Sequence, residues 1–258
     1  MRKLLSLLLA CSMLLSCLTL PAAADGSLAN FTRQSTYREG QYSDVNASDW
    51  YAENIKAGTE LGIVKGYGDR FGVGDLESIA EAIKYAEASG AVICNMSLSG
   101  AVKNKSIYDA MKQSKMLFVT SAGNNGRDND SRHVYPACYD IDNMIVVANA
   151  TCDGTLFRHS NYGKKSVDIA APGSYILSTT PENGYGYLTG TSMSAPVVSA
   201  AAAMLYSNYS NITLKRVKDI LLATARANDA LEGKCATGGI LDLGAAMEYA
   251  ARLKNLKA

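Results

Sequence analysis

One run of seven residues, Gly190–Pro196 (Gly-Thr-Ser-Met-Ser-Ala-Pro), constrains the fold of this chain more than any other segment. It leads directly into Val197–Tyr206, a segment of small and apolar residues that has apolar positions on every side of a helix. This pattern predicts a buried helix. The first N–H groups of a helix have no partner within it and lie at the positive end of its dipole, so they stabilise negative charge. Ser192 is therefore placed either as a nucleophile with electrostatic support or, like Thr191, as an ordinary helix cap.

The exact residues of this run favour one of the two possibilities. Together with the Val-Val-Ser-Ala-Ala-Ala-Ala-Met-Leu that follows it, the run resembles the nucleophile segment of the subtilisin-like serine proteases, or subtilases. In that family the serine of the Gly-Thr-Ser-Met sequence attacks the carbonyl carbon of the scissile bond. The resemblance implies that Ser192 is a catalytic nucleophile and that the substrate is a peptide or protein, hydrolysed through an acyl-enzyme.

The second half of the chain alternates apolar segments with segments of helical periodicity. The predicted strands are 91–100 (ending in a small-residue loop), 116–120, 144–148 and 167–170, and the predicted helices are 79–86, 105–115, 197–206, 211–225 and 243–253. Continuous apolar strands that alternate with helices of about ten residues are typical of βαβ units. The sequence therefore predicts an α/β fold with a mainly parallel sheet.

Residues 78–249 resemble the C-terminal two-thirds of a subtilase domain, which implies an incomplete subtilisin-like three-layer fold. Asn95–Leu98 resembles the strand that holds the substrate, and Ser121–Gly126 resembles the segment whose asparagine completes the oxyanion hole. The resemblance implies that the Asn124 amide donates to the oxyanion beside the Ser192 N–H. The substrate-binding residues that it implies are Ser97, Leu98, Ser99, Gly100, Ser121, Ala122 and Gly123.

A serine hydrolase also needs an imidazole that accepts the serine proton and a carboxylate that orients this imidazole. In subtilases both precede the substrate strand, in an Asp-Thr-Gly or Asp-Ser-Gly turn and a His-Gly-Thr-His helix start, and neither motif occurs here. The chain has two histidines, His133 and His159, and both are predicted to lie in surface loops. We therefore expect weak hydrolysis or none. The alternatives are a non-catalytic peptide- or cell-wall-binding protein with a protease fold, and a non-functional gene fragment.

The first part of the chain is predicted to contain no peptidase sequence. Residues 1–24 have a basic start, an apolar core and a small-residue cleavage site, typical of a secretory signal peptide, although Leu14–Cys17 also resembles a lipoprotein signal. Residues 25–41 are predicted to be a linker. Residues 42–75 resemble part of an S-layer homology (SLH) module, which implies a cell-wall polymer as a partner; otherwise they are a short helix and loop that pack Trp50 and Phe71. The peptidase domain is assigned to residues 76–258.

Charge and cysteine content exclude some classes of function and leave others open. The formal net charge of +1 gives no reason to expect nucleic acid as a partner, and no membrane span is expected after signal cleavage. Four cysteines remain outside the signal, Cys94, Cys138, Cys152 and Cys235, and four cysteines allow three pairings. Cys94 is expected to be a buried thiol. No spacing of Cys and His resembles a zinc site, so no metal and no cofactor are expected. The protein is predicted to be extracellular, with cell-wall association if the SLH-like segment binds.

Overall fold

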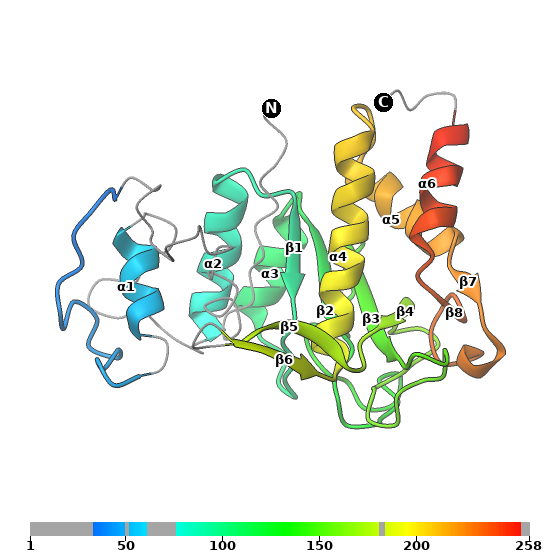
Figure 1. Cartoon of the computed structure of the whole chain (residues 1–258), viewed down its shortest axis with the longest axis horizontal. Helices are drawn as coiled ribbons and strands as arrows, with labels where there is room; N and C mark the ends of the chain where they lie inside the picture. The colour runs from blue at the N-terminus through cyan, green and yellow to red at the C-terminus, as the bar shows by residue number, and fades with distance from the viewer. Residues whose placement is uncertain (1–32, 50–51, 61–75, 181–183, 254–258) are drawn as a thin grey trace.

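The computed structural model describes residues 33–49, 52–60, 76–180 and 184–253 (Figure 1). The predicted signal peptide and the side chains of Trp50 and Phe71 lie outside this part of the chain. The strands are β1 (Ile93–Met96), β2 (Leu117–Ser121), β3 (Met144–Ala150), β4 (Ile169–Pro172), β5 (Ile176–Thr180), β6 (Gly184–Leu188), β7 (Arg226–Ala227) and β8 (Gly239–Ile240). The helices are α1 (Ala52–Glu60), α2 (Leu76–Ala88), α3 (Lys105–Gln113), α4 (Thr191–Asn208), α5 (Leu214–Ala223), the 3-10 helix η1 (Asp229–Leu231) and α6 (Leu243–Arg252).

Six of these strands form one sheet in the order β1-β2-β3-β4-β8-β7. All neighbouring pairs from β1 to β8 are parallel, and β7 alone runs antiparallel to its neighbour β8. The strands β1, β2 and β3 are buried along their whole length because helices cover both faces of the sheet. The predicted α/β class and the mainly parallel sheet are confirmed.

Two separate apolar cores define the three layers. On one face, α2 and α3 contribute residues such as Ile83 and Met111 to a core that includes Phe118. On the other face, α4, α5 and α6 contribute residues such as Val198 and Leu221 to a core that includes Val119. The residues of a strand that point to one face therefore belong to one core, as the two-residue period of a strand requires. The helices on both faces confirm the predicted three-layer subtilisin-like arrangement.

The helix α4 begins earlier than the sequence predicts. It starts at Thr191 with Gly190 as its N-cap, so Ser192 lies inside the first helical turn. In Figure 1, α4 stands in front of the strands, with its N-terminus at the lower end of the view, where β1 also ends. The carboxyl ends of β1 and β2 and the N-terminus of α4 thus meet at one edge of the sheet.

The prediction that this helix is buried is correct only for its inner side. Ala195, Val198, Ala202 and Leu205 are fully buried against the sheet. The outer side is equally apolar, but Met204 on that side is 46% exposed. The reason is that no other described element packs over that side of α4.

Residues 33–60 carry a small apolar cluster of their own, formed by Tyr42, Val45, Ala52 and Ile55. The segment that the sequence predicts to be a linker contacts α1 through Arg33, which forms an ion pair of 2.7 Å with Glu60. Helix α1 matches the helical run expected in the SLH-like segment, and the assignment of that segment remains a prediction. Within the described residues, no helix is both long and apolar enough to cross a membrane.

Candidate active site

Ser192 is half-buried in the first turn of α4, where its backbone and side chain both contact Ser97. The Ser97 hydroxyl donates to the Ser192 carbonyl over 2.8 Å, and the Ser192 hydroxyl lies 3.4 Å from the Ser97 carbonyl. Pro196 explains the first contact: proline lacks an N–H, so the Ser192 carbonyl has no helical donor four residues later. The Ser97 hydroxyl supplies the missing donor and ties the start of α4 to the end of β1.

Two further side chains extend this link along the inner side of β1. Asn95 is buried and donates through Nδ2 to the Ser97 hydroxyl over 2.9 Å. The Ser199 hydroxyl, two turns along α4, donates to Asn95 Oδ1 over 3.1 Å. The sequence places Asn95 in the strand that resembles the substrate-holding segment, but it does not predict the contacts that Asn95 and Ser199 make here. A polar residue at an inward-facing position of an otherwise apolar strand was the only available signal.

Asn124 lies beside the nucleophile, and its amide group has a defined orientation. Its Oδ1 accepts from the Thr191 N–H (2.9 Å) and from the Thr191 hydroxyl (3.1 Å). The same hydroxyl accepts from the Gly123 N–H over 3.2 Å. Because Oδ1 is occupied, Nδ2 is the group left to donate, and no hydrogen bond from it occurs within the described residues. Asn124 is exposed, so a ligand can reach this donor.

Two buried asparagines hold the loop that carries Asn124. The Asn161 side-chain oxygen, Oδ1, accepts from the backbone N–H groups of Asn125 and Arg127 at 2.9 and 3.1 Å. The Asn161 backbone N–H donates to the Gly123 carbonyl. Asn129 donates to the Ala122 carbonyl and accepts from Asn161 Nδ2. Gly123 has φ 106°, and a side chain there would lie 2.5 Å from Asn161 Nδ2, so only glycine fits. The sequence does not predict the roles of these two asparagines, because isolated polar residues in loops form no recognisable pattern.

A second close approach fixes Gly190, the N-cap of α4. The Gly190 N–H donates to the Gly173 carbonyl over 2.9 Å. A Cβ atom on Gly173 would lie 1.9 Å from the Ser194 hydroxyl and 2.7 Å from the Gly190 carbonyl. Because Gly173 has no side chain, the segment that carries it can lie directly against Gly190 and Ser194 in the first turn of α4.

The residues implied as substrate contacts differ in what they leave free. Gly100 exchanges both of its backbone hydrogen bonds with Tyr135, at 2.8 Å each, and Gly123 also uses both of its backbone groups within the fold. Ala122 donates to the Val147 carbonyl and accepts from Asn129, and the Ser121 hydroxyl lies 3.4 Å from the Leu98 carbonyl. Within the described residues, the main-chain N–H groups of Ser97 to Ser99 form no hydrogen bond and remain open beside Ser192, whereas the Ser97 and Leu98 carbonyls lie 3.4 Å from the Ser192 and Ser121 hydroxyls. Ser99 is exposed.

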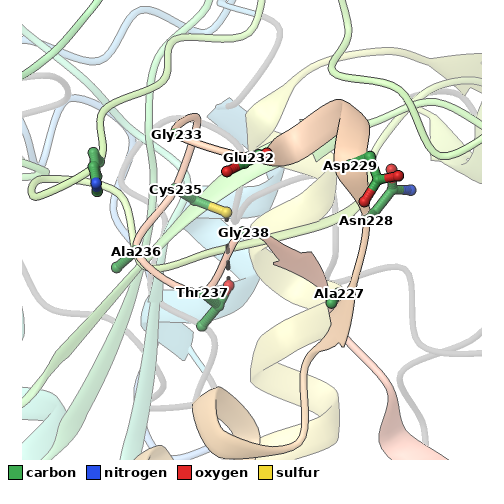
Figure 2. A pocket seen from close by; sticks show the side chains of 10 residues that line it. Ala227, Asn228, Asp229, Glu232, Gly233, Cys235, Ala236, Thr237 and Gly238 are labelled. Carbon is green, nitrogen blue, oxygen red and sulfur yellow. Dashed lines mark hydrogen bonds between the residues drawn. The ribbon is translucent and has the colours of Figure 1, made fainter.

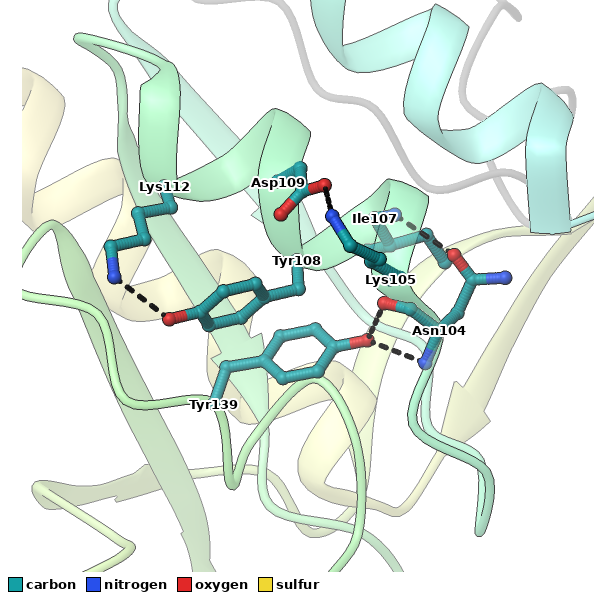
Figure 3. Close-up of polar contacts among 7 residues, drawn as sticks. All are labelled: Asn104, Lys105, Ile107, Tyr108, Asp109, Lys112 and Tyr139. Carbon is teal, nitrogen blue, oxygen red and sulfur yellow. Dashed lines mark hydrogen bonds and ion pairs between the residues drawn. The ribbon is translucent and has the colours of Figure 1, made fainter.

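The loop after this segment is fixed at the start of α3 (Figure 3). The Asn104 side chain caps α3 by accepting from the Ile107 N–H over 2.9 Å. The Tyr139 hydroxyl accepts from the Asn104 N–H and donates to the Asn104 carbonyl, at 3.1 and 2.9 Å. Burial raises the pKa of Tyr139, so this hydroxyl keeps the proton that it donates at neutral pH. The open segment is thereby anchored at both ends.

Neither histidine contacts Ser192. His133 is exposed, and its Nδ1 lies 3.4 Å from the Tyr135 hydroxyl. His159 is exposed and packs edge-on against the Phe157 ring. Both lie in loops, as predicted. Within the described residues, the Ser192 hydroxyl has no hydrogen bond to an imidazole or a carboxylate, so the part of the site that would accept its proton is absent from this region.

The cysteines and a pocket near β7 and β8 are not among the groups that contact Ser192. None of the three possible disulfide pairings of Cys94, Cys138, Cys152 and Cys235 is formed in the structure, and Cys94 is buried as expected. No group of three His, Cys, Asp or Glu side chains suited to a metal ion occurs in the described part of the chain. A pocket of about 470 Å³ lies at the turn between β7 and β8, lined by residues 227–229, 232–233 and 235–238 and by Lys164 (Figure 2). It contains none of the residues around Ser192.

Comparisons with known proteins agree with this geometry. The Subtilase family model (Peptidase_S8) matches residues 46–238, and so begins inside the SLH-like segment. The major intracellular serine protease of Bacillus subtilis (strain 168) is 36% identical over 197 residues, which are 69% of this chain and 60% of that protein. Subtilisin DY of Bacillus licheniformis is 34% identical over 158 residues, which are 60% of this chain and 57% of that protein.

Solved structures give the same result. A protease from Pseudoalteromonas arctica superposes with a TM-score of 0.58 at 29% identity, covering 67% of this chain and 58% of that one. The chain thus spans less than two thirds of the length of these relatives. The family match, the parallel sheet and the Ser192–Asn124 arrangement together show that this chain belongs to the subtilase family of serine proteases.

Proposed function

We propose that this chain carries the nucleophile-bearing part of a subtilase peptidase site, and that alone it hydrolyses peptides very weakly or not at all. The observation that carries the proposal is the arrangement at the start of α4. Ser192, the free Asn124 Nδ2 and the open segment Ser97–Ser99 lie together, but no described imidazole reaches the serine. The substrate class is a peptide or protein.

The chemistry follows from the groups present and the one that is missing. Ser192 Oγ would add to the carbonyl carbon of a peptide bound along Ser97–Ser99. The carbonyl oxygen would become an oxyanion, with the Asn124 Nδ2 and the Ser192 N–H as donors. The C–N bond would then break, the amine would leave with the proton taken from the serine, and water would hydrolyse the acyl ester. Without an imidazole, the serine proton has only water as acceptor, so the first step is slow.

The size of this deficit is known from subtilisin, a relative of this chain. Removal of the triad histidine alone lowers kcat of subtilisin by about 2 × 10⁶, and the oxyanion hole and binding keep roughly 10³–10⁴ over the uncatalysed rate. The same residual acceleration is the ceiling that we expect for this chain by itself.

The test is hydrolysis of fluorogenic peptides by the mature chain, Asp25–Ala258, with and without added imidazole. If Ser192 and Asn124 are in place and only the base is missing, free imidazole accepts the serine proton and the rate rises with its concentration. A Ser192→Ala variant controls for hydrolysis by imidazole itself. Equal rates for the two proteins at every imidazole concentration would contradict the proposed role of Ser192.

A second candidate function is peptide binding without hydrolysis, favoured by the exposed position of Ser99 beside the site and by the missing base. It predicts that an uncleaved peptide binds equally well to the wild type and to Ser192→Ala, with no response to imidazole. The signal-like residues 1–24 lead us to propose that either activity is extracellular, and the SLH-like segment 42–75 makes a cell-wall polymer the proposed anchor. Binding of the mature chain to purified cell walls tests that anchor.

A further inference from the structure

The hairpin of β5 and β6 stands apart from the main sheet. Among the described residues its two strands pair only with each other and form a sheet of their own. None of their described residues belongs to the apolar cores on the two faces of the main sheet, and none is charged. In Figure 1 the hairpin extends from the lower end of α4 as a separate two-stranded unit. A two-stranded hairpin of this kind gains little stability from burial, so its apolar side chains need another explanation.

One face of the hairpin is aromatic. Leu177 lies directly opposite Tyr187 in the antiparallel register, and Tyr185 is two residues before Tyr187. Since side chains alternate between the two faces of a strand, these three share one face. Tyr185 is 76% exposed, Tyr187 66% and Leu177 55%, and neither tyrosine side chain forms a hydrogen bond or a ring contact within the described residues. We call these three residues the tyrosine face.

Tyr175, at the base of the hairpin, is an independent sign that exposed rings are used here. Its φ is 55°, and no other described residue except glycine has a positive φ. In this conformation the Cβ atom of an L residue crowds the backbone, whereas glycine adopts it freely. The Tyr175 ring is 80% exposed, so it returns little packing to the fold. A strained position without a structural return is typical of residues that contact a ligand.

The base of the hairpin is tied to the first turn of α4. The strand β6 ends shortly before the N-cap Gly190, and the intervening Thr189 accepts from the Tyr175 N–H over 2.9 Å. The Gly190 N–H donates to the carbonyl of Gly173, in the segment that leads into β5. Both strands of the hairpin are therefore held beside the end of α4 that carries Ser192.

The length of the hairpin sets the part of a bound peptide that it can contact. Tyr185 is the residue of the tyrosine face on β6 that is farthest from Ser192 along the chain. An extended chain spans at most about 3.6 Å per residue, so Tyr185 lies within roughly 25 Å of the nucleophile. A peptide that reacts at Ser192 can therefore reach the face with residues that lie within about seven positions of the scissile bond.

We infer that the tyrosine face and Tyr175 bind the peptide substrate at an uncharged, apolar stretch within about seven residues of the bond that Ser192 attacks. This inference rests on the proposed function and names the class of substrate: peptides with an apolar stretch beside the scissile bond. Apolar side chains of the peptide pack on the tyrosine rings, which have few rotatable bonds and lose little entropy on binding. The continuity of the face with the start of α4 is the observation that favours the substrate as the occupant.

Other occupants fit the face less well. Nucleic acids and anionic membrane surfaces are bound mainly through lysine and arginine, and none of the described hairpin residues is charged. A cell-wall glycan also stacks on exposed aromatic rings. The hairpin, however, is joined to the first turn of α4 and not to the SLH-like segment, for which a glycan is the proposed partner.

The test measures binding of peptides to the mature chain with Ser192→Ala, so that no peptide is cleaved. Three fluorescein-labelled Gly/Ser peptides, each of about 20 residues to span the face from either side, share a central Ala-Ala-Leu-Ala. One carries a Leu-Val-Phe-Leu block before the centre, one carries it after the centre, and one has no block. We expect a block in one of the two positions to tighten binding about tenfold, and the double change Tyr185→Ser and Tyr187→Ser to remove this gain.

Two further variants separate binding from folding. Tyr249→Ser is the matched control, because Tyr249 is 46% exposed but lies on α6, and it should leave the binding of all three peptides unchanged. Tyr175→Gly relieves the strained backbone, so Tm should rise by about 2–4 °C while the gain from the block falls several-fold. A fall in Tm would show that the ring stabilises the fold, and would contradict its assignment to the substrate.

The outcomes distinguish this inference from the proposed function. No gain from either block with a well-folded chain, or an equal loss in Tyr249→Ser, would overturn the inference. Tyrosine-dependent binding to phosphatidylglycerol vesicles or purified cell walls, without any gain from the blocks, would also overturn it. Tyrosine-dependent peptide binding, with imidazole-assisted hydrolysis that does not depend on Ser192, would refute the nucleophile role and leave the tyrosine face in place.

Discussion

Asn124 combines a structural acceptor and a catalytic donor in one side chain, and two substitutions separate them. Its Oδ1 accepts two hydrogen bonds from Thr191, a fully buried residue in the first turn of α4. Its Nδ2 is the proposed oxyanion donor. Asn124→Ala removes both functions, whereas Asn124→Asp keeps an acceptor oxygen and removes only the amide donor.

The expected change in stability follows from the two hydrogen bonds. Each contributes about 0.5–1.5 kcal/mol, so Asn124→Ala should lower the free energy of unfolding by about 1–3 kcal/mol. For a domain of this size that is a fall in Tm of about 2–12 °C. Asn124→Asp should be at least as stable as the wild type at pH 7, because a carboxylate at a helix N-terminus gains about 0.3–1 kcal/mol at low ionic strength.

Chemical denaturation and calorimetry measure the stability difference, and imidazole-assisted peptide hydrolysis measures the donor. In subtilisin, loss of the oxyanion-hole asparagine lowers kcat by about 10²–10³, and we expect a comparable loss in both variants. Equal stability of the Ala and Asp variants would refute the structural role of Oδ1. Full imidazole-assisted activity in Asn124→Asp would refute the donor role of Nδ2.

Two further predictions concern the segments around the site. Gly173→Ala places a methyl group against the Ser194 hydroxyl and the Gly190 carbonyl, so it should lower the free energy of unfolding by about 1–3 kcal/mol, measured by thermal unfolding. Adding Ser194→Ala should restore part of this stability. An unchanged stability of Gly173→Ala would contradict the close contact. Burial raises the pKa of Asp130, but hydrogen bonds from Ser166 and Lys165 outweigh it and hold this pKa below its usual value. Asp130→Asn should therefore reduce stability at pH 6, by a difference that shrinks as the pH falls through the lowered pKa; a difference that is constant with pH would contradict this.

The sequence predicts the framework of the fold well. Apolar runs such as Met144–Ala148 are long enough to indicate strands buried on both faces, and the Thr213 cap correctly indicates the start of α5, where its side chain accepts from the Arg216 N–H. It does not predict that α4 begins at Thr191, because Pro196 and two serines argue locally against a helix there. Contacts with Ser97 and Asn124 supply what the local sequence lacks.

The sequence also predicts only part of the candidate site. The Gly-Thr-Ser-Met run identifies Ser192 because the motif is contiguous, and the Gly-flanked loop identifies Asn124. The residues that hold them, Asn95 and Asn161, are distant in sequence, and their hydrogen bonds appear only after the chain has folded. The sequence also does not predict that the outer side of α4 is exposed, because the composition of an apolar helix indicates that the whole helix is buried.

Fluorophosphonate labelling of the folded mature chain, alone, tests the central claim most directly. The account holds that Ser192 is a correctly placed nucleophile without a base. It predicts labelling at least about 10³-fold slower than that of subtilisin DY under the same conditions, because the imidazole that activates the serine is missing. Rapid labelling that disappears in Ser192→Ala would show that this chain activates the serine by itself, and would contradict the account.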